Sequence, residues 1–302
     1  MKVIDLFSGC GGMSLGFQNS GYNLIAAFDN WKPAIDVYRD NFSHPVIECD
    51  LGSEEAIEKI KEFDADMIVG GPPCQDFSIA GPRDDNGKRA NLTITFIDII
   101  GEIKPEWMVM ENVYNIERSR VLPEVLRKLN SFGYGVSYRV LDASFLGVPQ
   151  ARKRFFLVGH LDSNDNFLEE DLLSNHTLVP LTVREYMGDK LAFDYYYAHP
   201  RSYNRRAIFS VDEPSSTIRG VNRPMPKTYK KHPGDKTNVF PNLKSLTTKQ
   251  RSLLQTFPEE FILNGTKTSL EQAIGNAVPV KMAEHVAFAI KKYIDRKKLI
   301  KS

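Results

Sequence analysis

The chain has 302 residues, of which 42% are hydrophobic and 25% charged, with a formal net charge of +1 at pH 7. This length allows one large domain with a smaller partner, and the apolar content excludes a disordered chain. No run approaches the ~18 consecutive apolar residues of a membrane span, and the first apolar run, residues 3–7, is too short for a signal peptide. The sequence therefore predicts a soluble, cytoplasmic protein with no membrane contact.

Strand-like and helix-like runs alternate over the first 160 residues. The expected strands are 2–7, 24–28, 46–49, 66–70, 107–111, 136–141 and 155–159. The expected helices are 12–19, 32–41, 54–63, 90–103 and 121–131. This alternation is typical of a doubly wound, mostly parallel α/β sheet of the Rossmann-like class.

The alternation ends near residue 160. Residues 166–245 are rich in Pro, Tyr, Asn and Arg and predict a smaller, irregular domain, whereas helical periodicity returns at 246–257 and 279–294. We expect the last helix to pack back on the first domain. The predicted division is therefore a large domain of residues 1–165 plus 273–302, a small domain of 166–245 and a hinge or connecting segment of 246–272.

Charge is distributed unevenly along the chain. Residues 1–75 hold twelve acidic against five basic residues, whereas residues 201–236 hold nine basic against three acidic ones. A solvated surface of uneven charge is one interpretation. The other is a surface for phosphates and base edges, which the aromatic residues and irregular turns of the basic stretch favour.

Three successive strand ends carry features of a nucleoside site. A glycine-rich turn with Gly9, Gly11 and Gly12 follows the first strand and lacks the G-x-G-x-x-G spacing of a pyrophosphate cradle. Asp29 ends the second strand and is placed to hold ribose hydroxyls. Asp50 follows the third strand and offers a carboxylate to the amino group of an adenine. Phe7 is placed to stack on the ring of that adenine. The alternative for both acids is capping of the next helix.

The fourth and later strands carry groups suited to covalent chemistry. Cys74 follows Gly-Gly-Pro-Pro, a stiff loop at a strand end, whereas Cys10 and Cys49 are interpreted as buried apolar residues. Three widely spaced cysteines indicate free thiols, and together with the scattered histidines they predict no metal site. Glu111 ends a buried strand, where burial is expected to raise its pKa and make it a proton donor. Arg152 and Arg154 occupy alternate positions of a strand start, so we expect both to clamp one carbonyl or phosphate.

In these segments the sequence resembles the DNA cytosine carbon-5 methyltransferases of bacterial restriction–modification systems. The match runs in order along nearly the whole chain and includes "DLFSGCGG", "GPPCQDFSIAG", "ENV", "QARKR", "NRRAIFSVDEPSSTI" and "IGNAVPV". The resemblance implies an S-adenosylmethionine-dependent methyltransferase fold, with residues 166–245 as the target-recognition domain. It also implies double-stranded DNA with a short recognition site as the partner, a monomer with no obligatory protein partner, and a cognate restriction endonuclease that acts separately.

The resemblance also assigns roles to single residues. It implies that Cys74 adds to carbon 6 of cytosine, that Glu111 protonates ring nitrogen 3, and that Arg154 holds the base carbonyl with Arg152 nearby. The residues implied for S-adenosylmethionine, with S-adenosylhomocysteine as product, are Phe7, Gly9, Gly11, Gly12, Asp29, Asn30, Asp50, Leu51, Pro72, Asn276, Ala277 and Val278. Asn30 stands where many members of the family carry an aromatic residue.

Cys74 must reach the face of carbon 6, which stacking covers, so the target base must be flipped out of the duplex. The loop 79–91 is expected to close over DNA, and an ordinary surface loop is the alternative. The residues expected to contact DNA are Ser78, Arg83, Arg219, Arg223, Lys227, Lys230 and Lys231. Among them Arg223 is the first candidate for reading guanine, because a guanidinium pairs with its groove edge through two hydrogen bonds.

Two other functions compete with DNA methylation. The same chemistry on transfer RNA is one, and the target-recognition segment argues against it. A non-catalytic DNA-binding module is the other, and the intact set of Cys74, Glu111 and Arg154 argues against that. An NAD oxidoreductase is excluded, because the "PPCQ" loop has no role there. DNA as the partner would place the protein at the bacterial nucleoid.

Overall fold

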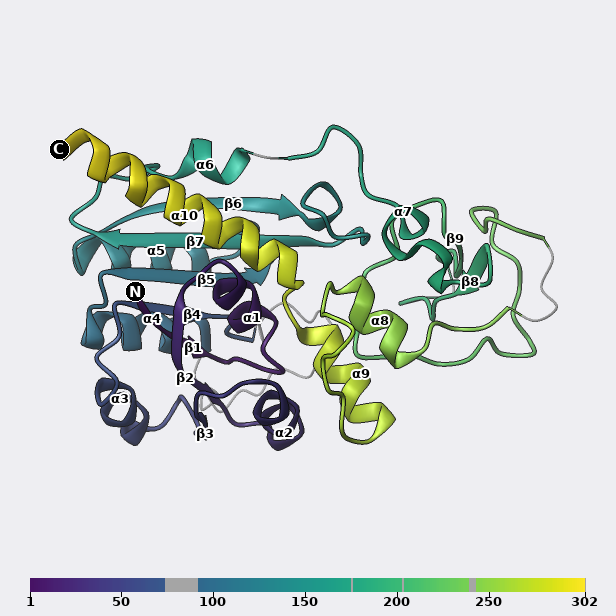
Figure 1. Ribbon diagram of the computed structural model, residues 1–302, viewed down its shortest axis with the longest axis horizontal. Coiled ribbons are helices and arrows are strands. Elements are labelled where there is room, and N and C mark those ends of the chain that lie inside the picture. Colours follow the sequence, from purple (N-terminus) through teal and green to yellow (C-terminus); the bar gives the residue numbers. More distant parts are fainter. Residues whose placement is uncertain (74–91, 175, 203, 239–242, 302) are drawn as a thin grey trace.

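The computed structural model describes residues 1–73, 92–174, 176–202, 204–238 and 243–301. Its main element is a seven-stranded sheet in the order β3-β2-β1-β4-β5-β7-β6 (Figure 1). The strands are β1 (Lys2–Leu6), β2 (Asn23–Asp29), β3 (Val46–Glu48), β4 (Met67–Gly70), β5 (Trp107–Val113), β6 (Tyr134–Asp142) and β7 (Lys153–Leu161). Pairs from β3 to β5 are parallel, whereas β7 runs antiparallel to both β5 and β6. The mostly parallel sheet is therefore confirmed, with one reversed strand.

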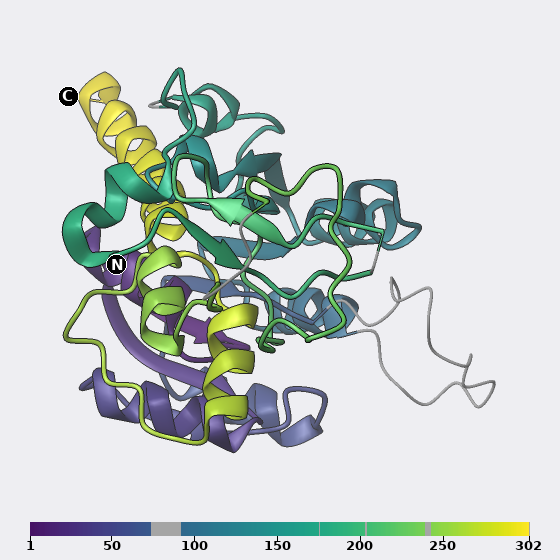
Figure 2. The ribbon, with the colours of Figure 1, turned by 90° about the vertical axis from the view of Figure 1, so that its right-hand side faces the viewer.

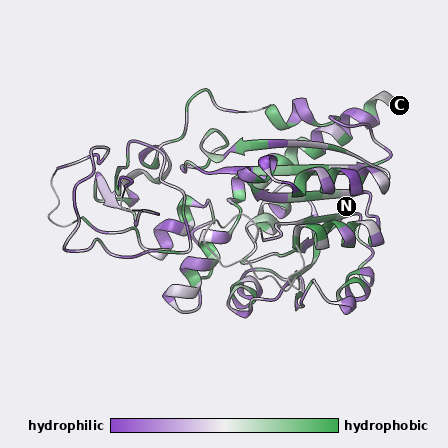
Figure 3. Cartoon of the chain, turned by 180° about the vertical axis from the view of Figure 1, so that it is seen from behind, coloured by the Kyte–Doolittle hydropathy of each residue, from purple (hydrophilic) through white to green (hydrophobic). Residues whose placement is uncertain are grey.

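Helices cover both faces of the sheet. Val3 packs with α1 (Gly12–Asn19) and α10 (Val280–Lys301) on one face. The next residue, Ile4, packs with α3 (Glu54–Lys61), α4 (Leu92–Ile103) and α5 (Val121–Ser131) on the other. Because successive strand residues point to opposite faces, strands buried on both sides become continuous apolar runs. Hydrophobic stretches of the sheet and of the helices that cover it are green in Figure 3.

The remaining helices lie near the connection to the second part of the molecule. The helix α2 (Lys32–Asn41) has the expected bounds and packs with α9 (Lys267–Asn276), which the sequence reading missed. A further helix, α8 (Thr248–Leu254), begins at a capping box formed by Thr247 and Gln250. Figure 2 shows α8 and α9 side by side next to the sheet. The segment predicted to be a hinge, residues 246–272, thus contains α8 and the first part of α9.

A small lobe, defined here as residues 183–246, projects from one side of the sheet (Figure 1). It contains α7 (Val183–Met187), β8 (Tyr195–Tyr197) and β9 (Ile208–Ser210), and its core includes Leu254 of α8 and Ile274 of α9. The short helix α6 (Glu169–Leu173) instead packs against α10 of the large domain. The predicted domain boundaries remain a proposal. They assign α6 to the small domain, although it packs against α10.

The carboxyl ends of the parallel strands point toward the small lobe (Figure 1). In open α/β sheets this edge is where ligands bind. Among the described residues no group of three His, Cys, Asp or Glu side chains is placed to hold a metal ion. The same part of the chain contains no helix long and apolar enough to cross a membrane.

Candidate active site

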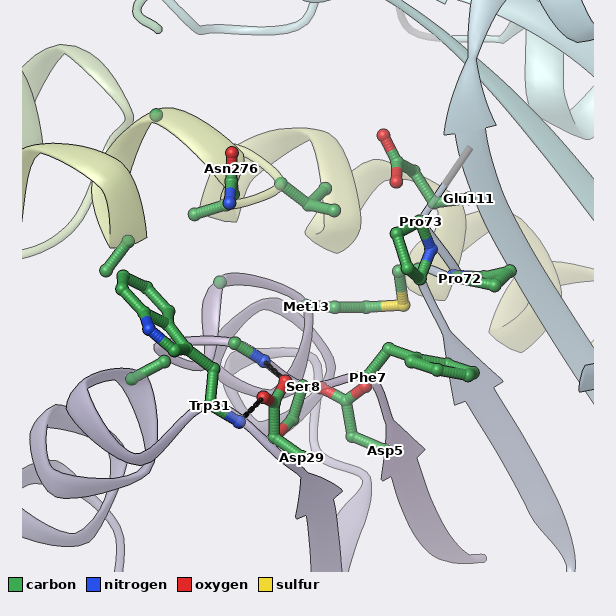
Figure 4. A pocket seen from close by; sticks show the side chains of 18 of the residues that line it. Asp5, Phe7, Ser8, Met13, Asp29, Trp31, Pro72, Pro73, Glu111 and Asn276 are labelled. Atoms are coloured by element: carbon green, nitrogen blue, oxygen red, sulfur yellow. Dashed lines mark hydrogen bonds between the residues drawn. The ribbon is translucent and has the colours of Figure 1, made fainter. Parts of the chain in front are cut away.

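A cavity of about 430 Å³ opens where β1, β2, β4 and β5 end. Figure 4 shows Asp29 and Trp31 at one end of it and Glu111 with Pro72 and Pro73 at the other. The sequence-predicted residues that line it are Phe7, Gly9, Gly12, Asp29, Asn30, Pro72, Glu111, Arg154, Asn276, Ala277 and Val278. This volume is in the range of pockets that enclose small molecules and cofactors. One cavity therefore brings together many of the expected cofactor residues with the expected catalytic residues Glu111 and Arg154.

Asp29 organises the cofactor end of the cavity. Its Oδ2 accepts a hydrogen bond from the backbone N–H of Gly9 at 2.8 Å, and its Oδ1 accepts one from Trp31 at 2.8 Å (Figure 4). The N-cap of α2 is Trp31 and not Asp29, so the capping alternative is wrong in that form, although the bond from Trp31 ties Asp29 to the helix entry. Each carboxylate oxygen retains a further lone pair for a ligand hydroxyl. The bond to Trp31 is therefore compatible with ligand binding by Asp29.

The glycine-rich turn brings other backbone close to the cavity. A Cβ at Gly12 would lie 2.1 Å from the carbonyl oxygen of Val278, so only glycine allows the chain before α10 to approach α1. Gly11 has a φ of 92°, and a Cβ there would meet the ring of Phe42 at 2.3 Å. Gly11 is not among the lining residues of the cavity. Its glycine is required by packing against α2, whereas Gly9 and Gly12 border the cavity directly.

Asp50 and Leu51 also stand apart from the lining residues of the cavity. The strand β3 already ends at Glu48, and Asp50 Oδ1 accepts a hydrogen bond from the N–H of Gly52 at 3.0 Å. Asp50 is thus part of the turn that leads into α3, with its second carboxylate oxygen still available. Its predicted contact with adenine stays a prediction.

Several residues that line the cavity were missed by the sequence reading, above all Trp31 and Asp5. Trp31 supplies an aromatic ring one position after Asn30, so its place directly after "DN" was an available signal. Asp5 was interpreted only as a strand residue. Its Oδ2 accepts a hydrogen bond from Ser14 at 2.6 Å, whereas its buried Oδ1 has no partner. Burial raises the pKa of Asp5 to about 7, an effect that the Ser14 hydrogen bond opposes.

Glu111 and Arg154 form an ion pair at the other end of the cavity. They come from the neighbouring strands β5 and β7, and Arg154 Nε lies 2.8 Å from Glu111 Oε1. Burial raises the pKa of Glu111, and the charges of Arg154 and Arg152 oppose that rise. Burial thus favours the protonated form of Glu111, and the two arginines favour its carboxylate. Its role as a proton donor stays a prediction.

Cys74, Ser78 and Arg83 lie outside the described residues, as does the predicted loop 79–91. The chain that leads to Cys74 is described as far as Pro73, which lines the cavity with Pro72. Asn112 Nδ2 donates a hydrogen bond to the carbonyl oxygen of Pro72 at 3.2 Å, and this amide is itself buried. The "ENV" and "PPCQ" segments are thereby joined at the cavity wall.

Comparison with known proteins assigns the family. A model of the C-5 cytosine-specific DNA methylase family matches residues 1–292. The chain belongs to this family. The methylase is 54% identical over 292 residues to the type II methyltransferase M.HindV of Haemophilus influenzae, covering 96% of each chain. It is 50% identical over 300 residues to M.HgiDI of Herpetosiphon aurantiacus, covering 99% of this chain and 97% of that one.

Solved structures share the fold of the methylase. The Dnmt2 methyltransferase of S. pombe superposes with a TM-score of 0.75 at 18% identity, covering 97% of this chain and 99% of that one. A putative DNA modification methyltransferase encoded within an E. coli prophage gives a TM-score of 0.71 at 20% identity, with 98% and 99% covered. The family, its DNA cytosine carbon-5 chemistry and the methyltransferase fold expected from the sequence are thus confirmed. S-adenosylmethionine is the cofactor that this family implies.

Arg152 does not form the predicted clamp with Arg154. Its side chain is 1% exposed and donates to three backbone carbonyls, those of Ile218 at 2.8 Å, Gly275 at 3.1 Å and Ala277 at 3.0 Å. The reason is that β7 begins at Lys153, so Arg152 precedes the strand and strand alternation does not govern its direction. The interpretation of Arg152 as a partner of Arg154 on one ligand is corrected accordingly.

The predicted DNA-contacting residues of the small lobe fall into two groups. Arg219 is half-buried and donates to the carbonyl of His199, and burial with the nearby charges of Arg201 and Arg205 lowers its pKa. The exposed group consists of Arg223, Lys227, Lys230 and Lys231. Within the described ranges none of these four has an ion-pair partner. The methylase therefore presents unneutralised cations on this lobe, whose contact with DNA stays a prediction.

Proposed function

We propose that the methylase modifies a cytosine flipped out of a short recognition site in double-stranded DNA, through a covalent adduct of Cys74. The observation that carries this proposal is the single cavity with two chemically different ends. Asp29 and Trp31 at one end suit a nucleoside, and the Glu111–Arg154 pair at the other suits a cytosine ring. Pro72 and Pro73, which precede Cys74 in the sequence, line the cavity at the Glu111 end.

The cavity fits the cofactor that the family implies. Asp5 Oδ1 is buried without a partner in its wall and suits the ammonium group of the methionine moiety. Asp29 would hold the ribose hydroxyls, and Phe7 and Trp31 offer rings for the adenine. Asp50 would use its free oxygen on the adenine amino group. Backbone of Gly9, Gly11, Gly12, Leu51, Pro72 and residues 276–278 would complete the site. When bound, S-adenosylmethionine supplies an electrophilic methyl group.

The chain's own residues would activate the cytosine. The Cys74 thiolate forms a bond to carbon 6, and the proton of Glu111 passes to ring nitrogen 3, which leaves carbon 5 nucleophilic. Arg154 holds the base carbonyl and keeps the Glu111 carboxylate stable once its proton has left. After carbon 5 has been methylated, a base removes the proton from carbon 5 and the Cys74–carbon 6 bond breaks. The proton on nitrogen 3 then returns to Glu111.

The small lobe would recognise the DNA sequence. Its cations Arg219, Arg223, Lys227, Lys230 and Lys231 would bind phosphates or base edges, with Ser78 and Arg83 contributing from beside Cys74. The type II methyltransferases M.HindV and M.HgiDI cover nearly the whole chain, which supports membership in a restriction–modification system. In this proposal the methylase acts as a monomer on cytoplasmic, nucleoid-associated DNA, and a cognate endonuclease acts separately.

Bisulfite sequencing of DNA from cells that express the methylase tests this proposal and identifies the site. We expect one cytosine in a short, recurring sequence to be methylated. Purified methylase given transfer RNA and duplex DNA in separate reactions should methylate the DNA alone. Methylation of the RNA in place of the DNA would support the competing RNA function, and no methylation of either would support the non-catalytic module.

A further inference from the structure

One buried guanidinium bridges the small lobe and the cofactor cavity. Arg152 Nη1 donates to the carbonyl of Ile218, directly before the cationic residue Arg219. Nη2 of the same group donates to the carbonyls of Gly275 and Ala277, and both of these residues line the cavity. The planar guanidinium of Arg152 is therefore hydrogen-bonded to two segments at once. One, at Ile218, is expected to lie near DNA, and the other, at Gly275 and Ala277, is expected to lie near the cofactor.

The backbones on the two sides of this guanidinium are in direct contact. A Cβ at Gly275 would lie 2.2 Å from the backbone nitrogen of Gly220, so no side chain separates α9 from the small lobe here. The buried Arg251 donates to the carbonyl of Arg219 and forms an ion pair with Glu271 of α9. Residues 218–220 therefore cannot shift without moving α9 or breaking these bonds.

The charge of Arg152 is costly in this place. Its hydrogen-bond acceptors are backbone carbonyls, its Nε is buried without a partner, and burial lowers its pKa. A buried cation without a directly bonded carboxylate pays a large desolvation penalty. Neighbouring Gln150 and Gln255 donate to backbone carbonyls with neutral amides. An amide cannot hold three carbonyls from two segments at once, whereas the planar guanidinium can.

We propose that Arg152 is a positioning residue that couples DNA binding at the small lobe to cofactor binding in the cavity. The inference rests on the proposed function, which places DNA and cofactor at these two segments. Whichever ligand binds first fixes the carbonyls on one side of the guanidinium and so orders the other side for the second ligand. Such coupling is reciprocal, because both ligands bias one shared element.

Titration calorimetry with S-adenosylhomocysteine measures this coupling. Its Kd is determined for the free methylase and for the methylase bound to a duplex that carries the recognition site. We expect the duplex to tighten S-adenosylhomocysteine binding by roughly tenfold, within the usual range for linked sites. In Arg152→Met the two Kd values should agree within about twofold. A merely structural role would weaken both complexes and leave their ratio unchanged, and that result would overturn the proposal.

Asp171→Asn is the matched control. Asp171 is 2% exposed and ion-paired with Arg296 and Lys292 on α10, and neither Asp171 nor its partners line the cavity. This variant should lose stability while keeping the wild-type ratio of the two Kd values. A ratio that falls equally in Asp171→Asn and Arg152→Met would assign the effect to general destabilisation and contradict the role of Arg152.

Amide hydrogen exchange on the wild-type methylase tests the proposal even if Arg152→Met fails to fold. The recognition duplex alone should slow exchange in residues 273–278, and S-adenosylhomocysteine alone should slow it in residues 215–222. Protection confined to each ligand's own segment would refute coupling. If S-adenosylhomocysteine fails to bind the wild-type methylase at all, the cofactor site of the proposed function is what fails.

Discussion

Asp29 illustrates how a single residue shapes the site. Its two oxygens each accept a backbone hydrogen bond, one from the glycine-rich turn and one from the start of α2. These bonds fix the direction of the carboxylate and leave lone pairs facing the cavity. A preorganised acceptor of this kind binds ligand hydroxyls with little loss of side-chain conformational entropy.

Replacing Asp29 by Ala should therefore weaken S-adenosylmethionine binding by ~1.5–3 kcal/mol, because charge-assisted hydrogen bonds to the ribose are lost. Calorimetry measures the affinity, and affinity for DNA should change little. Asp36→Ala is the control, because Asp36 is a half-buried residue on α2 that forms ion pairs with Lys32 and Arg39 and does not line the cavity. Unchanged cofactor affinity in the Asp29 variant would leave Asp29 only its role at the helix entry.

The role of a single residue could be predicted where the sequence also predicted its position within a strand or helix. Asp29 ends β2, Glu111 lies near the end of β5, which continues to Val113, and both acids line the cavity. Arg152 was misread because its role depends on carbonyls from distant segments, which no local pattern reveals. Trp31 was missed because it lies between a strand and a helix, where neither periodicity applies.

At the level of elements, the sequence predicts the sheet domain closely and the connecting helices poorly. The helices α1, α2 and α5 have their expected bounds. In α2 and α5 the apolar residues gather on one buried face, whereas α1 follows directly on the glycine-rich turn. The helix α9 has a mixed composition and is held by contacts with α2, so its stability comes from tertiary packing. The five-residue helices α6 and α7 are too short to show a period at all.

The buried carboxyl group of Asp5 in β1 makes the stability of the fold depend on pH. Because the folded-state pKa of Asp5 is raised to about 7, folding favours its protonated form. The contribution of Asp5 to the free energy of unfolding is complete below about pH 4. It is lost as the pH rises toward about 7, and the loss amounts to at most roughly 4 kcal/mol. Denaturant unfolding of the cofactor-free methylase from pH 4 to 8 should show this decline, and Asp5→Asn should remove it. The same decline in Asp5→Asn would assign the pH dependence to other groups.

At the level of the whole molecule, the small lobe lies beside the carboxyl ends of the parallel strands (Figures 1 and 2). Its exposed cations include Arg223, Lys227, Lys230 and Lys231. The sequence predicts that lobe from its basic, irregular composition, but its internal contacts depend on α8 and α9. Which cations read bases depends on DNA contacts that composition does not encode. Arg223 remains the first candidate, because it is exposed and Pro224 limits how its backbone relaxes.

If Arg223 reads a guanine, Arg223→Ala should cost ~1–3 kcal/mol on the recognition duplex and less on a scrambled one. Binding to both duplexes at several salt concentrations measures this. Lys231→Ala is the control for a phosphate contact, and it should weaken both duplexes alike and reduce the salt slope by about one. Equal losses of affinity for the two duplexes in Arg223→Ala would show that Arg223 does not read a base.

The covalent step is the central claim, and a duplex with 5-fluorocytosine at the target position tests it most directly. Fluorine cannot leave as the proton does, so Cys74 should stay bonded to carbon 6 after methyl transfer. In the presence of S-adenosylmethionine, wild-type methylase should form a complex with this duplex that survives denaturing electrophoresis, and Cys74→Ala should form none. No trapped complex with the wild type, or methylation that persists in Cys74→Ala, would contradict the account.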